Sequence, residues 1–419
     1  MLRFQKDSVV AVAFTLFAAA WSQAQERPVV IKGATILTMT HGTIEDGTVV
    51  VDKGKIAAVG KDVQAPPGAD VIEARGEYVL PGLVDPHSHL GVYSLPELQA
   101  NADGNEMTGD IEAQVRSEDA INTDDPEIAR AASGGVTTVQ VLPGSGNNIG
   151  GWATIVKLNG GQTLDEIQFR GAPPSMKWAW GENQKRSYGS KGQAPSTLMG
   201  EAAVVRQKLY DAQNYTAKWK AWEEGGKKGA PPERDLQLEA LAQVLAGKVR
   251  LNIHSYQVNH FEALFRIADE FHFQIAALHH ALDAYMIAPE IARRHIGVVT
   301  FADLWGGKVE MWDAIPQNAY VLWKNGVTVS LHTDNPVIEE RRGRARDRDH
   351  QPGENPGHRQ PRGLDRGRQG RRPDRLDRPP ARAGLEGRQG VHRREAGLYT
   401  EGRLSAVEKP SRDAGAVGQ

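Results

Sequence analysis

The segment LPGLVDPHSHLGVYS, residues 80–94, carries two histidines, His87 and His89, directly after an apolar run. Side chains alternate along a β-strand, so a strand that ends here directs both imidazoles to the same side. Two imidazoles on one side are suitable ligands for one Zn²⁺ ion. Two exposed surface histidines would have the same spacing, so the pair alone does not decide between the two interpretations.

Three other strand-like runs end in residues of the same chemistry. His254 ends VRLNIH, His280 ends IAALHH, and Asp334 ends VTVSLHTD. In a parallel barrel the C-terminal ends of the strands converge on one mouth, where active sites form. Four imidazoles and one carboxylate there predict a nitrogen and oxygen site for zinc or a similar divalent ion. His279 and His280 are adjacent and point to opposite sides of a strand, so we expect only one of them to face this mouth.

The runs around these residues predict the elements that position them. From Pro28 to Leu80, short β-branched runs are broken by Gly and Asp, which predicts a small group of strands. After Leu83, apolar strand-like runs alternate with amphipathic helical runs, which predicts a parallel sheet of βα units and, with ligands at the strand ends, a TIM barrel. A doubly wound sheet is the alternative, but no G-x-G-x-x-G loop follows an early strand. Residues 205–235 read as an inserted charged helix and loop. The Gly- and Asn-rich loop 143–151 either lines the substrate pocket or is a simple turn.

Composition narrows the chemistry. The 419 residues are 40% hydrophobic and 24% charged, which is ordinary for a soluble globular protein. There is no cysteine, so disulfides, thiolate zinc sites and cysteine nucleophiles are excluded. Any metal must be held by His, Asp, Glu or a modified Lys.

The first residues predict a secretory signal. Arg3 and Lys6 precede an apolar run, residues 9–21, that is too short to span a bilayer comfortably, and Ala24 ends a typical cleavage site. We expect residues 1–24 to be a signal peptide and the chain to be periplasmic or secreted, with no stable membrane anchor after cleavage. An apolar helix that belongs to the fold is the alternative.

The C-terminal segment has a different composition. Residues 341–419 contain 19 Arg and one Lys against 11 acidic residues, and no Ile, Phe, Met or Trp. Such a segment cannot form a core, which predicts disorder. A basic tail can bind nucleic acid, but this one lacks aromatic residues interleaved with its arginines to stack on bases. We therefore expect no nucleic-acid partner.

Several motifs together resemble a known family. The chain is similar to the amidohydrolase superfamily of metal-dependent hydrolases, in the imidazolonepropionase-like branch that includes Xaa-Pro dipeptidases. The matching stretches cover roughly residues 28–340: LPGLVDPHSHLG, GVTTVQVLPGSGNNIGG, MKWAWGENQKR, LNIHSY, LHHALDAY and VSLHTDNPVI. The resemblance implies an α/β fold, a TIM (β/α)8 barrel over residues 81–342 with a small N-terminal β-sandwich subdomain over residues 25–80.

The resemblance also implies roles for single residues. His280 binds metal or polarises the substrate carbonyl, and Asp334 binds metal and takes a proton from the attacking water. Lys177 is placed where a carboxylated lysine bridges two ions in binuclear members; a plain cationic lysine is the alternative, and Lys157 is a competing candidate. The implied cofactor is one or two Zn²⁺ or other divalent ions, and the implied substrate is a small-molecule amide, peptide or cyclic amide. The sequence leaves the oligomeric state undecided, with a homo-oligomer as one alternative. The implied metal ligands are His87, His89, Lys177, His254, His280 and Asp334.

The chain departs from the family after the eighth strand. The family continues with a helical region and with strands that complete the small β-subdomain, whereas residues 343–419 form an Arg/Gly/Pro-rich tail. GC-rich codons read out of frame encode these residue types, so we hypothesise a frameshift near residue 343. The barrel is then incomplete at the C-terminus, which exposes apolar wall and strand edges, and an inactive remnant is the alternative function. Resequencing the source DNA around this codon tests the hypothesis, and an unbroken frame in independent reads contradicts it.

Overall fold

The structure, a computed structural model, describes residues 27–302 and 307–335. The predicted signal peptide, the tail over residues 343–419 and the hypothesised frameshift lie outside these residues. Among the residues described, none of the helices is both long and apolar enough to cross a membrane.

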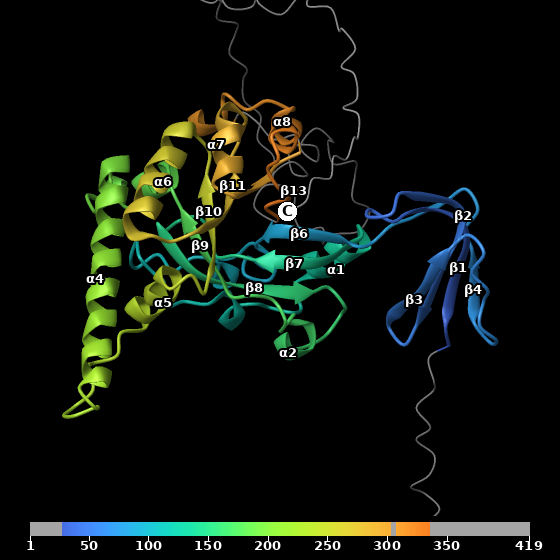
Figure 1. Cartoon of the computed structure of the whole chain (residues 1–419), viewed down its shortest axis with the longest axis horizontal. Helices are drawn as coiled ribbons and strands as arrows, with labels where there is room; N and C mark the ends of the chain where they lie inside the picture. The colour runs from blue at the N-terminus through green and yellow to red at the C-terminus, as the bar shows by residue number, and fades with distance from the viewer. Residues whose placement is uncertain (1–26, 303–306, 336–419) are drawn as a thin grey trace, which may run out of the picture. The chain divides into compact units, whose positions relative to one another are not determined.

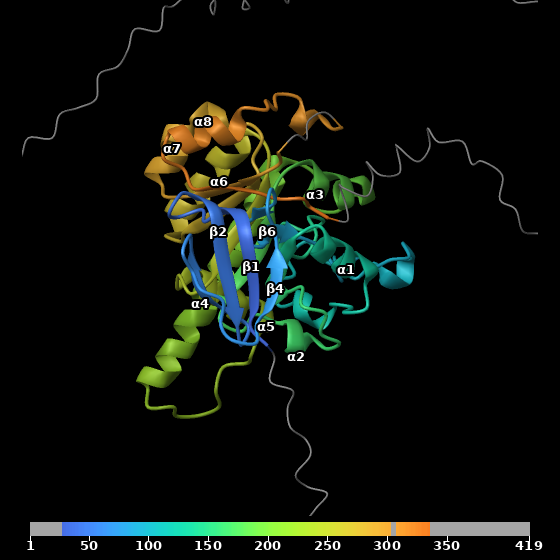
Figure 2. The ribbon, with the colours of Figure 1, turned by 90° about the vertical axis from the view of Figure 1, so that its right-hand side faces the viewer.

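The N-terminal strands form one small mixed sheet in the order β3-β2-β1-β4, with β5 also paired to β1. Figure 2 shows β1 and β2 side by side, and these two strands are antiparallel, whereas β4 and β5 run parallel to β1. The predicted second layer of a sandwich is not formed by the described residues. Ile56, Val71, Ile72 and Tyr78 are exposed. The strands are β1 Val29–Leu37, β2 Thr43–Asp52, β3 Lys55–Gly60, β4 Asp70–Glu73 and β5 Tyr78–Val79.

Eight further strands form a nearly closed barrel in chain order, which confirms the predicted fold (Figure 1). Backbone hydrogen bonds bring its ends together: Asp334 N–H donates to His87 O (3.1 Å) and His89 N–H donates to Asn335 O (2.7 Å). The strands are β6 Leu83–Ser88, β7 Val136–Val141, β8 Ile149–Lys157, β9 Ser175–Ala179, β10 Arg250–Ser255, β11 Ile275–His280, β12 Gly297–Thr300 and β13 Val329–Leu331.

One strand departs from the predicted all-parallel pattern. β8 is antiparallel to both β7 and β9, while the other paired barrel strands are parallel. The connection from β7 to β8, residues 142–148, is too short for the crossover that a parallel neighbour needs. The amino end of β8, not its carboxyl end, therefore lies at the mouth.

The helices pack around the barrel and bury its apolar side chains. The long helix α4 packs against α5 and α6 (Figure 1), and begins before the predicted insertion, with the Thr197 hydroxyl accepting from Gly200 N–H at 3.0 Å. Leu241 of α5, Phe261 of α6 and Ile253 of β10 belong to one buried cluster. The helices are α1 Pro126–Ser133, α2 Leu164–Ile167, α3 Glu182–Ser187, α4 Leu198–Glu224, α5 Leu236–Leu245, α6 Val258–Phe271, α7 Ala288–Arg293 and α8 Asn318–Lys324.

Among the described residues, the two strands at the barrel seam, β13 and β6, carry exposed apolar side chains. Leu331 of β13 is 52% exposed, and Leu83 and Val84 of the neighbouring β6 are 52% and 64% exposed. A covering helix after β13 would be formed by residues that lie outside the described ranges.

Candidate metal centre

Strand ends place the predicted ligands around one buried point at the barrel mouth. His87 lies in β6, His89 directly follows it, and Asp334 follows β13. Oδ1 of Asp334 lies 3.2 Å from His87 Nε2 and 3.1 Å from His89 Nε2. These three groups are spaced closely enough to hold one ion.

A second group of rings lies beside the first. The ring of His280, in β11, is centred 4.7 Å from the ring of His87 and 4.4 Å from that of His254 in β10. All three imidazoles are buried. His254 is held by a hydrogen bond of 2.8 Å between its Nδ1 and the Ser145 hydroxyl, which leaves Nε2 as the ring nitrogen that could bind a metal ion.

The prediction that only one of His279 and His280 faces the site is wrong. The Nδ1 of His279 lies 2.8 Å from the Nδ1 of His87, although His280 also contacts the ring of His87. His280 has a φ of 68° and Ala281 a φ of 41°, so the end of β11 leaves the extended conformation. Strand alternation no longer separates the two side chains once the backbone enters this left-handed region.

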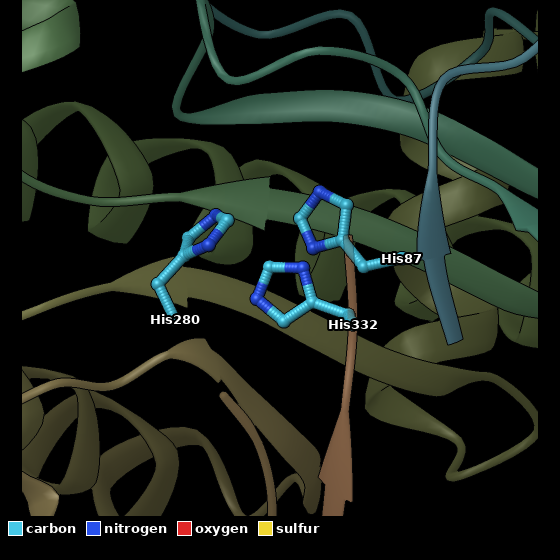
Figure 3. Close-up of side chains that lie close together, drawn as sticks. All are labelled: His87, His280 and His332. Carbon is cyan, nitrogen blue, oxygen red and sulfur yellow. The ribbon is translucent and has the colours of Figure 1, made fainter. Parts of the chain in front are cut away.

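His332 is a site residue that the sequence reasoning missed. Figure 3 shows the rings of His87, His280 and His332 pointing toward one another, and their nitrogens lie close enough together to hold an ion. The ring of His332 stacks on that of His87 with centroids 5.0 Å apart. The spacing His332-x-Asp334, the same as His87-x-His89, is the signal that could have found it.

The structure shows which of the two candidate lysines lies at the site. Lys177 is fully buried, and its Nζ lies 3.2 Å from His87 Nε2 and 3.3 Å from the Pro143 carbonyl oxygen. Lys157 is exposed, at the far end of the antiparallel β8, and its Nζ lies over the ring of Phe169. Lys157 is therefore not a site residue, because the reversal of β8 turns it away from the mouth.

The hydrogen bonds of His89 show that the pocket suits a cation. Its Nδ1 lies 2.7 Å from the Leu142 carbonyl oxygen, so the proton of a neutral ring must be on Nδ1. Nε2 then faces the Asp334 carboxylate at 3.1 Å, a distance at which a proton or a metal ion lies between the two atoms. The ring nitrogens of His280 and His332 are also buried without hydrogen-bond partners among the described residues. This donor set fits a divalent metal ion.

Burial controls the charge of the site. It lowers the pKa of His87, His254 and His280 well below the ordinary value, and it lowers the pKa of His332 to about 4. The imidazoles are therefore neutral near pH 7, which is the form that binds metal.

The pKa values of Lys177 and Asp334 are also shifted from their ordinary values. Burial lowers the pKa of Lys177 to about 7, so part of this amine is neutral near pH 7. Burial raises the pKa of Asp334, whereas its hydrogen bond with His89 and the nearby amine of Lys177 lower it, and the result lies below the ordinary value. Asp334 is therefore a carboxylate at neutral pH.

Comparison with known proteins identifies the family. No protein-family model matches the sequence. The chain is 37% identical over 316 residues to the amidohydrolase tasK of Hapsidospora irregularis, a match that covers 70% of this chain and 32% of that relative. The crystal structure of an amidohydrolase from Thermotoga maritima is 34% identical with a TM-score of 0.69, and covers 74% of this chain and 79% of that chain. The chain belongs to the amidohydrolase superfamily.

The predicted membership in the amidohydrolase superfamily is thus confirmed. A more distant similarity is to the imidazolonepropionase of Streptomyces avermitilis, 31% identical over 141 residues, which cover 31% of this chain and 34% of that relative. The chain spans about a third of the length of these curated relatives. This chain therefore shares its fold and its family with these relatives, and its activity is proposed below.

Proposed function

We propose that this amidohydrolase holds one or two divalent ions, with Zn²⁺ the first choice, and hydrolyses a C–N bond in a small amide, peptide or cyclic amide. The observation that carries the proposal is the meeting of His87 Nε2, His89 Nε2 and Asp334 Oδ1 at 3.1–3.2 Å in a buried pocket. A proton or a metal ion must lie between the carboxylate and each ring nitrogen at these distances, and the spacing of the three donor atoms suits one metal ion.

The residues present divide into two ligand groups. His87, His89 and Asp334 would hold one ion, and His254 and His280 would contribute to a second. Lys177 lies beside His87 and, as a partly neutral amine, is in the form that can be carboxylated to bridge the two groups. The resemblance to the imidazolonepropionase-like branch supports these roles.

The chain's own residues supply proton transfer and orientation. A bound divalent ion lowers the pKa of water to around 7 and polarises a carbonyl group. Asp334, ionised and itself one of the proposed ligands, would take the proton from the attacking water at a carboxylate oxygen and return it to the leaving nitrogen. His280 is a neutral imidazole with unpartnered nitrogens in the described structure, and it orients the scissile carbonyl when it is not a ligand.

The first residues of the sequence and the loops after the strands bear on where this activity takes place and on its substrate. We propose export to the periplasm or exterior on the basis of the signal-like residues 1–24. The substrate itself is read by loops after the strands, and such loops vary without a change of fold. The proposal therefore extends to the bond type and not to one compound.

Metal content is the measurement that tests the proposal. We expect one to two equivalents of zinc or a similar ion per chain, by elemental analysis after size exclusion, and loss of the metal in the double variant His87→Ala/His89→Ala. The matched control is His272→Asn/His295→Asn, because these two histidines are exposed and Asn tolerates their left-handed backbone.

Hydrolysis assays with dipeptides and cyclic amides follow on the metal-loaded protein. A soluble chain that holds no metal, or that keeps its metal in the double variant, contradicts the proposal. The first of these results would instead support the inactive-remnant alternative.

A further inference from the structure

One site histidine is held differently from its neighbours. The ring of His87 contacts His279 through a 2.8 Å hydrogen bond between the two Nδ1 atoms, and His279 Nε2 lies 2.9 Å from the Asn252 Oδ1 atom. All three side chains are buried. By contrast, His89 uses a backbone carbonyl and His254 a hydroxyl for the same purpose.

The direction of each hydrogen bond in this series follows from its last member, Asn252. The Asn252 Nδ2 atom donates to the Arg250 carbonyl oxygen at 3.3 Å, which leaves Oδ1 as the atom that faces His279. Because Oδ1 can only accept, His279 must carry a proton on Nε2. A neutral His279 ring then has a bare Nδ1, so the proton between the two Nδ1 atoms belongs to His87. His87 Nε2 is left unprotonated, on the side of Asp334 and Lys177.

A doubly protonated His279 would reverse this result. It would donate to both neighbours and force the proton of His87 onto Nε2, where it would block metal binding. A buried imidazolium requires an anionic partner. Within the described ranges, the hydrogen-bond partners of the His279 ring are an amide oxygen and another imidazole, and no carboxylate bonds to it. The arrangement therefore favours the neutral ring.

We propose that Asn252 and His279 form a proton-ordering chain that fixes His87 as the Nδ1–H tautomer and holds its Nε2 lone pair toward the metal. His279 is thus a positioning residue that acts through His87. The inference rests on the proposed function only for the presence of the metal. The tautomers themselves are a property of the metal-free protein.

The tautomers are measured by long-range ¹H–¹⁵N spectra of the full chain labelled with ¹⁵N-histidine, in the presence of a chelator. We expect His87 to be protonated on Nδ1 and His279 on Nε2, with signals assigned through His87→Gln and His279→Gln. Protonation of His87 on Nε2 overturns the proposal. A merely structural role of His279 would not determine which nitrogen of His87 carries the proton.

The positioning role is measured by zinc affinity in chelator competition. Loss of an outer hydrogen-bond partner of a metal-bound histidine weakens metal binding about 10–100-fold, so we expect this loss in His279→Leu. His279→Gln should recover most of the affinity, because its amide oxygen can accept from His87 while its NH₂ donates to Asn252. Asn252→Leu should weaken binding in the natural chain and have no further effect in His279→Leu.

The control is His260→Leu, which removes an equally buried imidazole that has no ring contact with the site histidines in the described structure. Unchanged zinc affinity in His279→Leu, or an equal loss in the control, overturns the positioning role. If His279→Leu does not fold, the comparison of His279→Gln and Asn252→Leu with the natural chain decides. If the natural chain holds no zinc, the proposed function fails, and the spectra still accept or reject the proton-ordering chain.

Discussion

Replacing Glu201 with Gln should stabilise the protein at neutral pH and have little effect in acid. Glu201 lies in the first turn of α4 and is fully buried. Its Oε2 accepts from Gly181 N–H at 3.0 Å and from the Asn148 amide at 3.4 Å. Glu201 therefore joins the loop before β8 to the segment after β9, the strand that carries Lys177. Burial raises its pKa from 4.5 to about 8.

The sign and the size of this change in stability follow from the linkage between proton binding and folding. A carboxyl group with a raised pKa in the folded state binds its proton more tightly there than in the unfolded chain. The folded state therefore loses stability as the pH rises from 4.5 to about 8, by about 1.4 kcal/mol per pH unit, and the loss is complete above pH 8. Between pH 5 and pH 7.5 this amounts to about 3 kcal/mol, and the uncharged Gln does not incur it.

Urea unfolding at pH 5 and pH 7.5, with a chelator present so that metal release does not contribute, measures this difference. Glu201→Gln should gain about 3 kcal/mol relative to the natural chain between the two pH values. Glu239→Gln is the control: hydrogen bonding to Arg234 lowers the pKa of Glu239 below 4.5, so its contribution changes only in more acidic solution, and the effect of this substitution should be nearly the same at both pH values. If the effect of Glu201→Gln is the same at both pH values, the carboxyl is not perturbed and the reasoning is refuted.

Three further predictions concern the core, the proposed catalytic carboxylate and the proposed metal. Leu241→Ala should destabilise the protein by about 2–5 kcal/mol in urea unfolding, because the side chain is fully buried in the barrel cluster; a loss under about 1 kcal/mol would mean that the site collapses freely. Asp334→Asn should lower the hydrolysis rate of the metal-loaded protein by about 10²–10⁴-fold, and an unchanged rate would exclude Asp334 as the proton acceptor. Removal of metal by a chelator should lower the thermal midpoint, with recovery when zinc is added back; a midpoint insensitive to both treatments would argue against a site within the barrel.

Much of the barrel could be predicted because its information is local. Apolar runs such as the one ending at His254 are bounded by helical runs of a different period, so strands and helices are distinguished within short windows. The close approach of His87, His89 and Asp334 could be predicted for the same reason, since parallel strand ends share one mouth. The small sheet was recognised as strands, although the described residues form a single layer.

The amino-acid sequence by itself determined which strands end in histidine or aspartate, and the absence of cysteine left nitrogen and oxygen atoms as the donors that a metal site could use. The tertiary structure decided the rest. The reversal of β8 separated Lys177 from Lys157, the left-handed end of β11 brought His279 to the ring of His87, and the barrel turned His332 inward. These features depend on the conformation of single residues at strand ends and on partners far apart in the chain, and neither leaves a periodic signal in the sequence.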